Sequence, residues 1–202
     1  MSWTKKAWFA GMLATTLGVS PIAAVVKADD AAMPAYRADM LNWVKDADSK
    51  LNDLAAAMPE AKYSWRPAKG VRSVGEVFLH VAASNYGVPA QMGVAPPEGF
   101  KYDGYEQSMT KKADIQKALK DSFAHVEQAL TNASEADLDK ETTLFGSMKT
   151  TVRGGYMLIL SHVHEHLGQS IAYARSNGVV PPWTAKQQAA MKEASEKKSD
   201  GK

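Results

Sequence analysis

The sequence contains no cysteine among its 202 residues. Disulfide bonds, thiolate metal ligands, thiol nucleophiles and a lipid anchor attached to cysteine are therefore excluded. Long biased tracts are also lacking, and 45% of the residues are hydrophobic against 23% that are charged. This composition indicates one ordinary globular domain with enough apolar surface to build a core.

The chain has no large excess of either charge. It carries 24 basic and 22 acidic residues, for a formal charge of +2. Lys5, Lys6 and Lys27 lie in an N-terminal segment without acidic residues, and removal of that segment would leave a formal charge of −1. A basic surface suited to phosphate backbones is therefore not expected, and we predict no nucleic-acid partner.

The N-terminal segment has the layout of a secretory signal peptide. Lys5 and Lys6 precede an uncharged stretch over residues 7–26, and residues 26–28 read Val-Lys-Ala, which is a small-residue cleavage site. We therefore expect residues 1–28 to be a signal peptide. The mature protein is expected to be periplasmic or secreted, with no membrane attachment after cleavage.

The alternative for this segment is a retained membrane anchor, because a run of about 20 apolar residues can just span a bilayer. Gly11, Gly18 and Pro21 interrupt the run. These interruptions, together with the cleavage site, favour the signal peptide.

Apolar residues recur at helical spacing in four long segments. The spacing predicts helices over residues 36–58, 74 to about 92, 110–132 and 151–176. No strand is predicted, and residues 134–146 are expected to form a connector with one short helical turn. Four amphipathic helices imply an all-α fold, a four-helix bundle in which each apolar stripe finds a partner.

Local signals support these boundaries. Ser73 and Glu76 have the spacing of a capping box, which predicts a helix beginning just after the serine. We expect the bundle to occupy residues 29–183. A charged, partly flexible tail over residues 184–202 could begin as a helix, but its end over residues 193–202 is expected to fray.

Three of the five histidines cluster in the last predicted helix. Residues four apart lie on one face of a helix, so His162 and His166 can share a metal ion, whereas His164 faces roughly the opposite side. His162 shares the interior side with Ile159 and Tyr173, where an imidazole pair without a ligand would be costly. Surface or packing histidines are the alternative for this pair taken alone.

His80 is the third candidate ligand, because it lies in the second predicted helix among Val77 and Val81. A lone histidine there would be a core residue, but three imidazoles together form a metal site. We predict that His80, His162 and His166 hold a divalent metal ion: zinc, nickel, iron or manganese. Such a site leaves coordination positions open to water or a substrate.

Other polar residues have weaker assignments, and no catalytic residue is identified. Gln169 could hydrogen-bond a water or substrate at the metal, or could be an ordinary polar residue. Glu165 is expected to point to solvent, and His125 is expected on the surface. Asn85 and Tyr86 could line the same cavity, although a structural role is the simpler expectation.

These residues together resemble the DinB-like superfamily of metal-binding four-helix bundles. The matching motifs are Tyr63-Ser64-Trp65-Arg66-Pro67, Val71-Arg72-Ser73-Val74-Gly75-Glu76 leading into His80, and His162 with His166 followed by Leu167-Gly168-Gln169. The similarity covers essentially all of residues 34–182. Residues 87–112 match nothing functional in the family.

The resemblance implies an up-down-down-up order of helices instead of the simple antiparallel order, a divalent metal between the second and fourth helices, and a homodimer. Family members with assigned activities include thiol-dependent transferases and isomerases. We therefore expect an exported metal-dependent enzyme, of hydrolase or thiol-transferase type, acting on a small-molecule substrate. The alternatives are a non-catalytic dimeric bundle that binds a metal or small ligand, and a structural dimer with a vestigial metal site.

Overall fold

The computed structural model describes residues 33–200. The predicted signal peptide, residues 1–28, lies outside the described residues. Within residues 33–200, no helix is long and apolar enough to cross a membrane.

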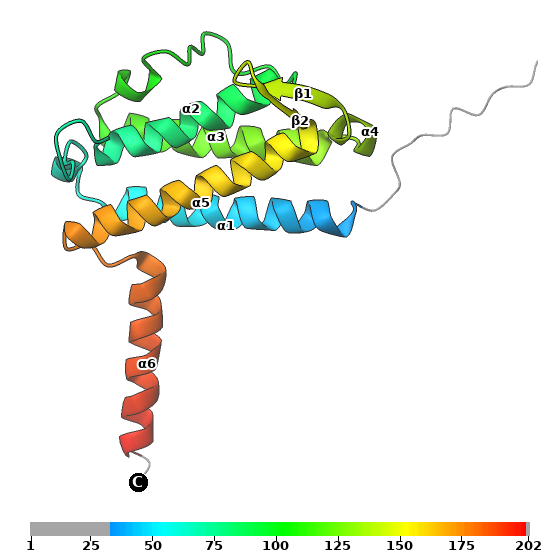
Figure 1. Cartoon of the computed structure of the whole chain (residues 1–202). Coiled ribbons are helices and arrows are strands. Elements are labelled where there is room, and N and C mark those ends of the chain that lie inside the picture. Colours follow the sequence, from blue (N-terminus) through cyan, green and yellow to red (C-terminus); the bar gives the residue numbers. More distant parts are fainter. Residues whose placement is uncertain (1–32, 201–202) are drawn as a thin grey trace, which may run out of the picture. The chain divides into compact units, whose positions relative to one another are not determined.

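Four long helices form the bundle (Figure 1). They are α1 over Ala35–Ala57, α2 over Val74–Gln91, α3 over Lys112–Asn132 and α5 over Val152–Ser176. The predicted four-helix bundle is confirmed, and the predicted ranges of the helices differ from these only at their ends.

Helices α2 and α3 run in the same direction, and α1 and α5 run in the opposite direction (Figure 1). A Cβ on Gly75, at the start of α2, would lie 3.0 Å from the Cδ1 atom of Ile115 at the start of α3. Lys112 in turn donates from its Nζ atom to the Ala56 carbonyl at the end of α1, at 2.8 Å. The long connection over residues 92–111 returns the chain along the bundle. The up-down-down-up order is therefore confirmed.

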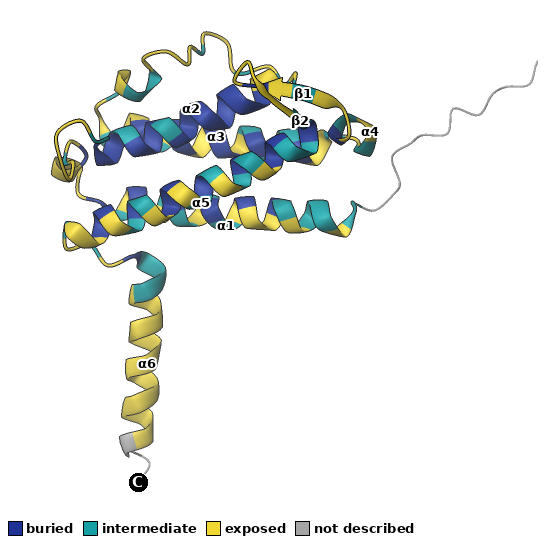
Figure 2. Cartoon of the chain, in the orientation of Figure 1, coloured by how far each residue is buried: buried dark blue, intermediate teal, exposed yellow. Residues whose placement is uncertain are grey.

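Helix α2 is the central element of the core, since it packs against both α3 and α5 and is buried along most of its length (Figure 2). Its sequence is apolar on nearly every face, as expected for a helix enclosed by others. The predicted capping box fixes where it begins: the Ser73 Oγ atom accepts from the Glu76 N–H, and the Glu76 Oε2 atom accepts from the Ser73 N–H at 2.6 Å. This fixed start determines which side of α2 carries His80.

The expectation that no strand occurs was wrong. After the predicted helical turn, which is α4 over Glu135–Leu138, an antiparallel hairpin forms from β1 over Glu141–Leu144 and β2 over Met148–Thr151. Two of the four residues in each strand are threonines, and β-branched residues favour extended backbone. Phe145 and Gly146 both adopt positive φ, at 52° and 73°, which makes the tight turn between the strands possible.

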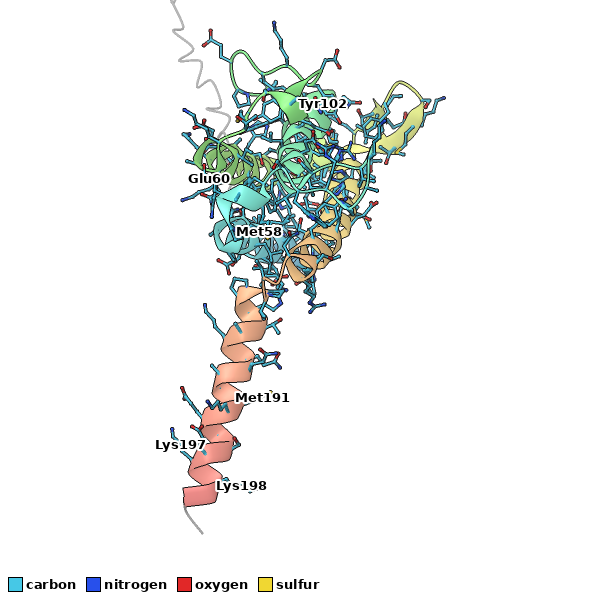
Figure 3. All side chains as sticks on the ribbon, turned by 90° about the vertical axis from the view of Figure 1, so that its left-hand side faces the viewer. Met58, Glu60, Tyr102, Met191, Lys197 and Lys198 are labelled. Atoms are coloured by element: carbon cyan, nitrogen blue, oxygen red, sulfur yellow. The ribbon has the colours of Figure 1, made fainter. Side chains whose placement is uncertain are left out.

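The C-terminal segment is helical throughout its described length. Helix α6 spans Pro182–Asp200, which includes residues 193–200 of the segment that was expected to fray. Its surface is mostly exposed, and Met191, for example, has 66% of its surface accessible (Figure 3). Charged residues dominate its last turns, including Lys197 and Lys198.

Candidate metal centre

The structure brings together the three histidines singled out in the sequence. His80 comes from α2, and His162 and His166 lie one turn apart on α5. The Nε2 atom of His162 lies 3.0 Å from that of His80 and 3.1 Å from that of His166. Candidate ligand atoms of the three residues all lie within 4.8 Å of one another, with His166 buried and the other two half-buried.

A carboxylate fixes the orientation of the His80 ring. The Nδ1 atom of His80 lies 2.7 Å from the Oε1 atom of Glu106, which belongs to a short 3₁₀ helix over Tyr105–Gln107. An ionised carboxylate can only accept, so Nδ1 carries the proton and the Nε2 lone pair faces the other histidines. Arg72 holds Glu106 in place through two hydrogen bonds, of 2.6 and 3.0 Å.

A second chain of hydrogen bonds fixes His166 in the same way. The Tyr173 hydroxyl donates to the backbone carbonyl of Arg72 at 3.1 Å and accepts from the Gln169 Nε2 atom at 3.0 Å. The Gln169 Oε1 atom therefore faces His166, whose Nδ1 atom lies 2.7 Å away and must donate. His166, like His80, directs its Nε2 atom to the centre.

Burial favours the neutral form of His162 and His80. Desolvation, followed by repulsion from His166 and His80, lowers the pKa of His162 to about 3. Desolvation also lowers the pKa of His80, although Glu106 partly opposes the effect. Burial alone would raise the pKa of Glu106, but its hydrogen bonds to Arg72 and His80 outweigh burial and lower that pKa, so the carboxylate remains ionised. Neutral imidazoles are the form that binds metal.

The donor set fits a divalent metal ion. Nitrogen ligands about 2.1 Å from one ion lie roughly 3.0 to 3.4 Å apart in octahedral or tetrahedral geometry. The two Nε2 separations from His162, 3.0 and 3.1 Å, agree with this range, and the ligand atoms of the third pair, His80 and His166, lie within 4.8 Å of each other. Rings held through Nδ1 by a carboxylate or an amide oxygen are also typical of metal-binding histidines. His80, His162 and His166 would hold the ion, with Glu106 and Gln169 as their outer supports.

A cavity of about 650 Å³ adjoins the histidines and is lined in part by His80 and His162. Its walls come from α2, α5, the connection over residues 92–111 and the turn of the β-hairpin. A molecule bound in this cavity would therefore lie beside the predicted metal position.

The other histidines and Glu165 lie outside the three-histidine cluster. His164 hydrogen-bonds the Leu160 carbonyl through Nδ1, at 2.8 Å, and its ring contacts Trp43, so it does not join the three histidines. Glu165 is exposed, as expected. His125 is half-buried rather than exposed, with its ring against Tyr86.

Asn85 does line the cavity beside the histidines. The Gln169 Oε1 atom bonds the His166 ring. Glu106 was missed altogether, because a single glutamate in a loop gives no sequence signal of its contact with His80.

Comparison with known proteins identifies the fold. The model of the DinB superfamily matches residues 44–170. No curated protein matches the chain in sequence. Among solved structures, a DinB-like protein from Bacillus cereus is 17% identical with a TM-score of 0.62, and the match covers 71% of this chain and 93% of that one.

Some of the similar solved structures belong to proteins described by an activity. YfiT from Bacillus subtilis, described as a probable metal-dependent hydrolase with an unusual four-helix bundle topology, is 12% identical with a TM-score of 0.56, covering 74% of this chain and 92% of that one. A mycothiol-dependent maleylpyruvate isomerase is 14% identical with a TM-score of 0.53, covering 67% and 60%. Identities this low show a shared fold only. The family model, however, spans more than half of the sequence, and the chain therefore belongs to the DinB superfamily.

Proposed function

We propose that the chain is a metal-dependent hydrolase that holds one divalent ion on His80, His162 and His166 and acts on a small molecule bound beside it. The observation that carries this proposal is the convergence of three Nε2 atoms next to a cavity of about 650 Å³. A divalent ion bound there would supply a Lewis-acidic centre with positions left for water or substrate.

The chain's own residues prepare this site before any substrate arrives. Glu106 and Gln169 hold two of the rings in one tautomer and one orientation, which reduces the reorganisation that metal binding requires. The largely apolar cavity walls would limit bulk water around a bound substrate, while water could still reach it at the metal position. The description of YfiT as a probable metal-dependent hydrolase supports the same class of reaction.

Thiol transfer is the second candidate reaction. Its support is the shared fold of a mycothiol-dependent isomerase, and an open metal position could bind a thiolate as well as a water. The two reactions differ in the second substrate, which is water for a hydrolase and a thiol for a transferase.

The test is elemental analysis of the purified chain followed by a substrate screen with added zinc, nickel or manganese. We expect about one divalent ion per chain and turnover of an ester or amide without added thiol. His162→Ala should lose both, while His164→Ala, on the same helix but outside the site, should retain both. Turnover only with an added thiol would favour transfer. Metal without any turnover would favour a binding protein, and no metal at all would contradict the proposal.

Export and dimerisation complete the proposal. Lys5, Lys6 and the small-residue site at residues 26–28 support cleavage of a leader, and the family resemblance supports a homodimer. Mass spectrometry of the protein from the periplasm or medium should give an N-terminus at Asp29. Sedimentation analysis of that protein should give the mass of two chains, and a single-chain mass would contradict the dimer.

A further inference from the structure

The cavity beside the histidines is largely apolar. Its apolar lining includes Val88, Pro96, Phe100, Tyr102, Phe145 and Ile159. A volume of about 650 Å³ lies within the range of roughly 300 to 1,000 Å³ that is typical of small-molecule sites. The cavity can therefore enclose a ligand of one or more rings.

Charged side chains do not take part in this lining. Among the described residues that form it, none is lysine, arginine, aspartate or glutamate. Its polar members are Ser84, Asn85 and Gln91, together with His80 and His162. An ionised group placed against these walls would lose its hydration without gaining an opposite charge, which is costly. The lining thus selects against charged ligands.

Two exposed aromatic residues lie on the cavity, and both are held by α2. Tyr102 is 50% exposed and Phe145 is 58% exposed. A Cβ on Gly87 would lie 2.8 Å from the Tyr102 ring, so glycine at this position allows the ring to rest on the helix. Gln91 accepts from the Phe145 N–H at 2.7 Å and donates to the Gly87 carbonyl at 3.1 Å.

Phe145 also has an unusual backbone. Its φ of 52° is in the left-handed region, which is strained for a bulky residue and is adopted more easily by glycine or asparagine. A strained phenylalanine that is mostly exposed gains little from core packing. Contact with a ligand would account for a phenylalanine at this position, because strained residues are concentrated at binding sites.

We propose that this cavity binds an uncharged, largely apolar ring compound, with its rings between Tyr102 and Phe145. The inference deepens the proposed function, because such a compound would be the substrate class of the metal enzyme. Binding in the cavity, however, depends on the walls and not on the metal. The two proposals can therefore be tested separately.

The experiment compares two fluorescent probes that differ in one group. N-phenyl-1-naphthylamine is uncharged and carries one N–H, and 8-anilino-1-naphthalenesulfonate has the same rings plus a sulfonate. Titrations use the full chain treated with EDTA, so that metal cannot attract the sulfonate. We expect the uncharged probe to bind with a Kd on the order of 10 μM and the sulfonate at least about tenfold more weakly. Absence of binding by the uncharged probe, or equal affinities, would overturn the inference.

Three variants locate the bound probe. Phe145→Gly removes the ring and suits the positive φ, so the uncharged probe should bind about tenfold more weakly while the melting temperature does not fall. Met148→Ala, a comparably exposed residue of the same hairpin outside the cavity, should leave affinity unchanged. Ala90→Arg, at an exposed position on the cavity, should reverse the preference toward the sulfonate.

A zinc titration of the same proteins separates the two proposals. Phe145→Gly should retain the zinc affinity of the unchanged chain, because Phe145 does not contact the histidine cluster or its outer supports. Zinc binding without probe binding would overturn the cavity assignment and leave the metal proposal intact. Probe binding without zinc binding would support the cavity assignment and overturn the metal proposal. Unchanged probe affinity in Phe145→Gly and Ala90→Arg would also place the probe elsewhere and overturn the inference.

Discussion

Arg72 anchors both histidines whose tautomers are fixed. Its guanidinium holds Glu106, which orients His80, and its backbone carbonyl accepts from Tyr173, which leads through Gln169 to His166. Outer partners of this kind raise the basicity of a ligand and reduce the disorder of its ring. One residue at the entrance to α2 therefore sets the donor geometry on both α2 and α5.

Glu106→Ala should weaken zinc binding by about 10- to 100-fold, the usual cost of removing an outer partner of a histidine ligand. The ring of His80 would lose both its fixed tautomer and the negative charge that raises its basicity. Competition with a chromophoric chelator would measure the change. Glu98→Ala, an exposed glutamate of the same connection, is the matched control and should leave affinity unchanged. Equal affinities in both variants would show that Glu106 does not support a ligand.

Tyr173→Phe tests the second hydrogen-bond chain with a smaller change. Loss of the hydroxyl leaves the Gln169 amide without its fixed partner, so the amide can rotate and His166 can adopt either tautomer. We expect zinc affinity to fall by several-fold, up to about tenfold. Nitrogen NMR of the metal-free protein should show a mixture of His166 tautomers in the variant and one tautomer in the unchanged chain. A single unchanged tautomer would contradict the role of Tyr173.

At the scale of elements, the four helices could be predicted because each repeats its apolar residues over several turns. The contacts made by the connection over residues 92–111 could not be predicted in this way. This connection carries Glu106 to His80 and supplies Phe100 and Tyr102 to the cavity, yet these contacts depend on the packed bundle and leave no periodic signal. The hairpin was missed for a related reason: strands of four residues are too short to show alternation, and their threonines also occur in polar loops.

Only part of the candidate site could be predicted from the sequence. The spacing of His162 and His166 places two rings on one face of a helix, and this follows from helix geometry alone. That His80 meets them depends on the order of the helices, which came from the family resemblance and not from the periodicity. Gln169 was correctly placed near the site, and the structure adds that it bonds the ring of His166.

Asp48, on the side of α1 near α3, makes the free energy of unfolding depend on pH. Burial, followed by repulsion from Glu127, raises the pKa of Asp48 from 3.8 to about 6. The folded chain therefore binds this proton more tightly than the unfolded chain. The contribution of Asp48 to stability is fully present below about pH 4 and is lost as the pH rises through about 6.

Asp48→Asn should remove this dependence. We expect the variant to be more stable than the unchanged chain at pH 7, by on the order of 1 kcal/mol after allowance for solvent screening, and nearly equal to it at pH 4. Urea unfolding at several values between pH 4 and 7 would measure the difference. Asp53→Asn, an exposed carboxylate of the same helix, should keep the original dependence. A gain in Asp48→Asn that does not vary with pH would contradict the assignment.

At the scale of the whole molecule, a metal on three histidines would join α2 to α5. These helices are far apart in sequence and already in contact, so a bound ion would stabilise the native arrangement without changing it. The unfolded chain would lose much more conformational entropy than the folded chain in bringing the three rings to one ion. Metal should therefore raise the free energy of unfolding of the entire bundle.

Zinc at about 100 times its Kd should stabilise the folded chain by about 2.7 kcal/mol. For a domain of this size, that corresponds to a rise in melting temperature of roughly 5 to 10 °C. Calorimetry with zinc and with EDTA would measure it. His162→Ala should abolish the difference because it removes the central nitrogen, whereas His164→Ala should preserve it because His164 lies outside the cluster and packs on Trp43. An identical response to zinc in both variants would mean that the metal binds elsewhere, and the shared point between α2 and α5 would then have no role as a metal centre.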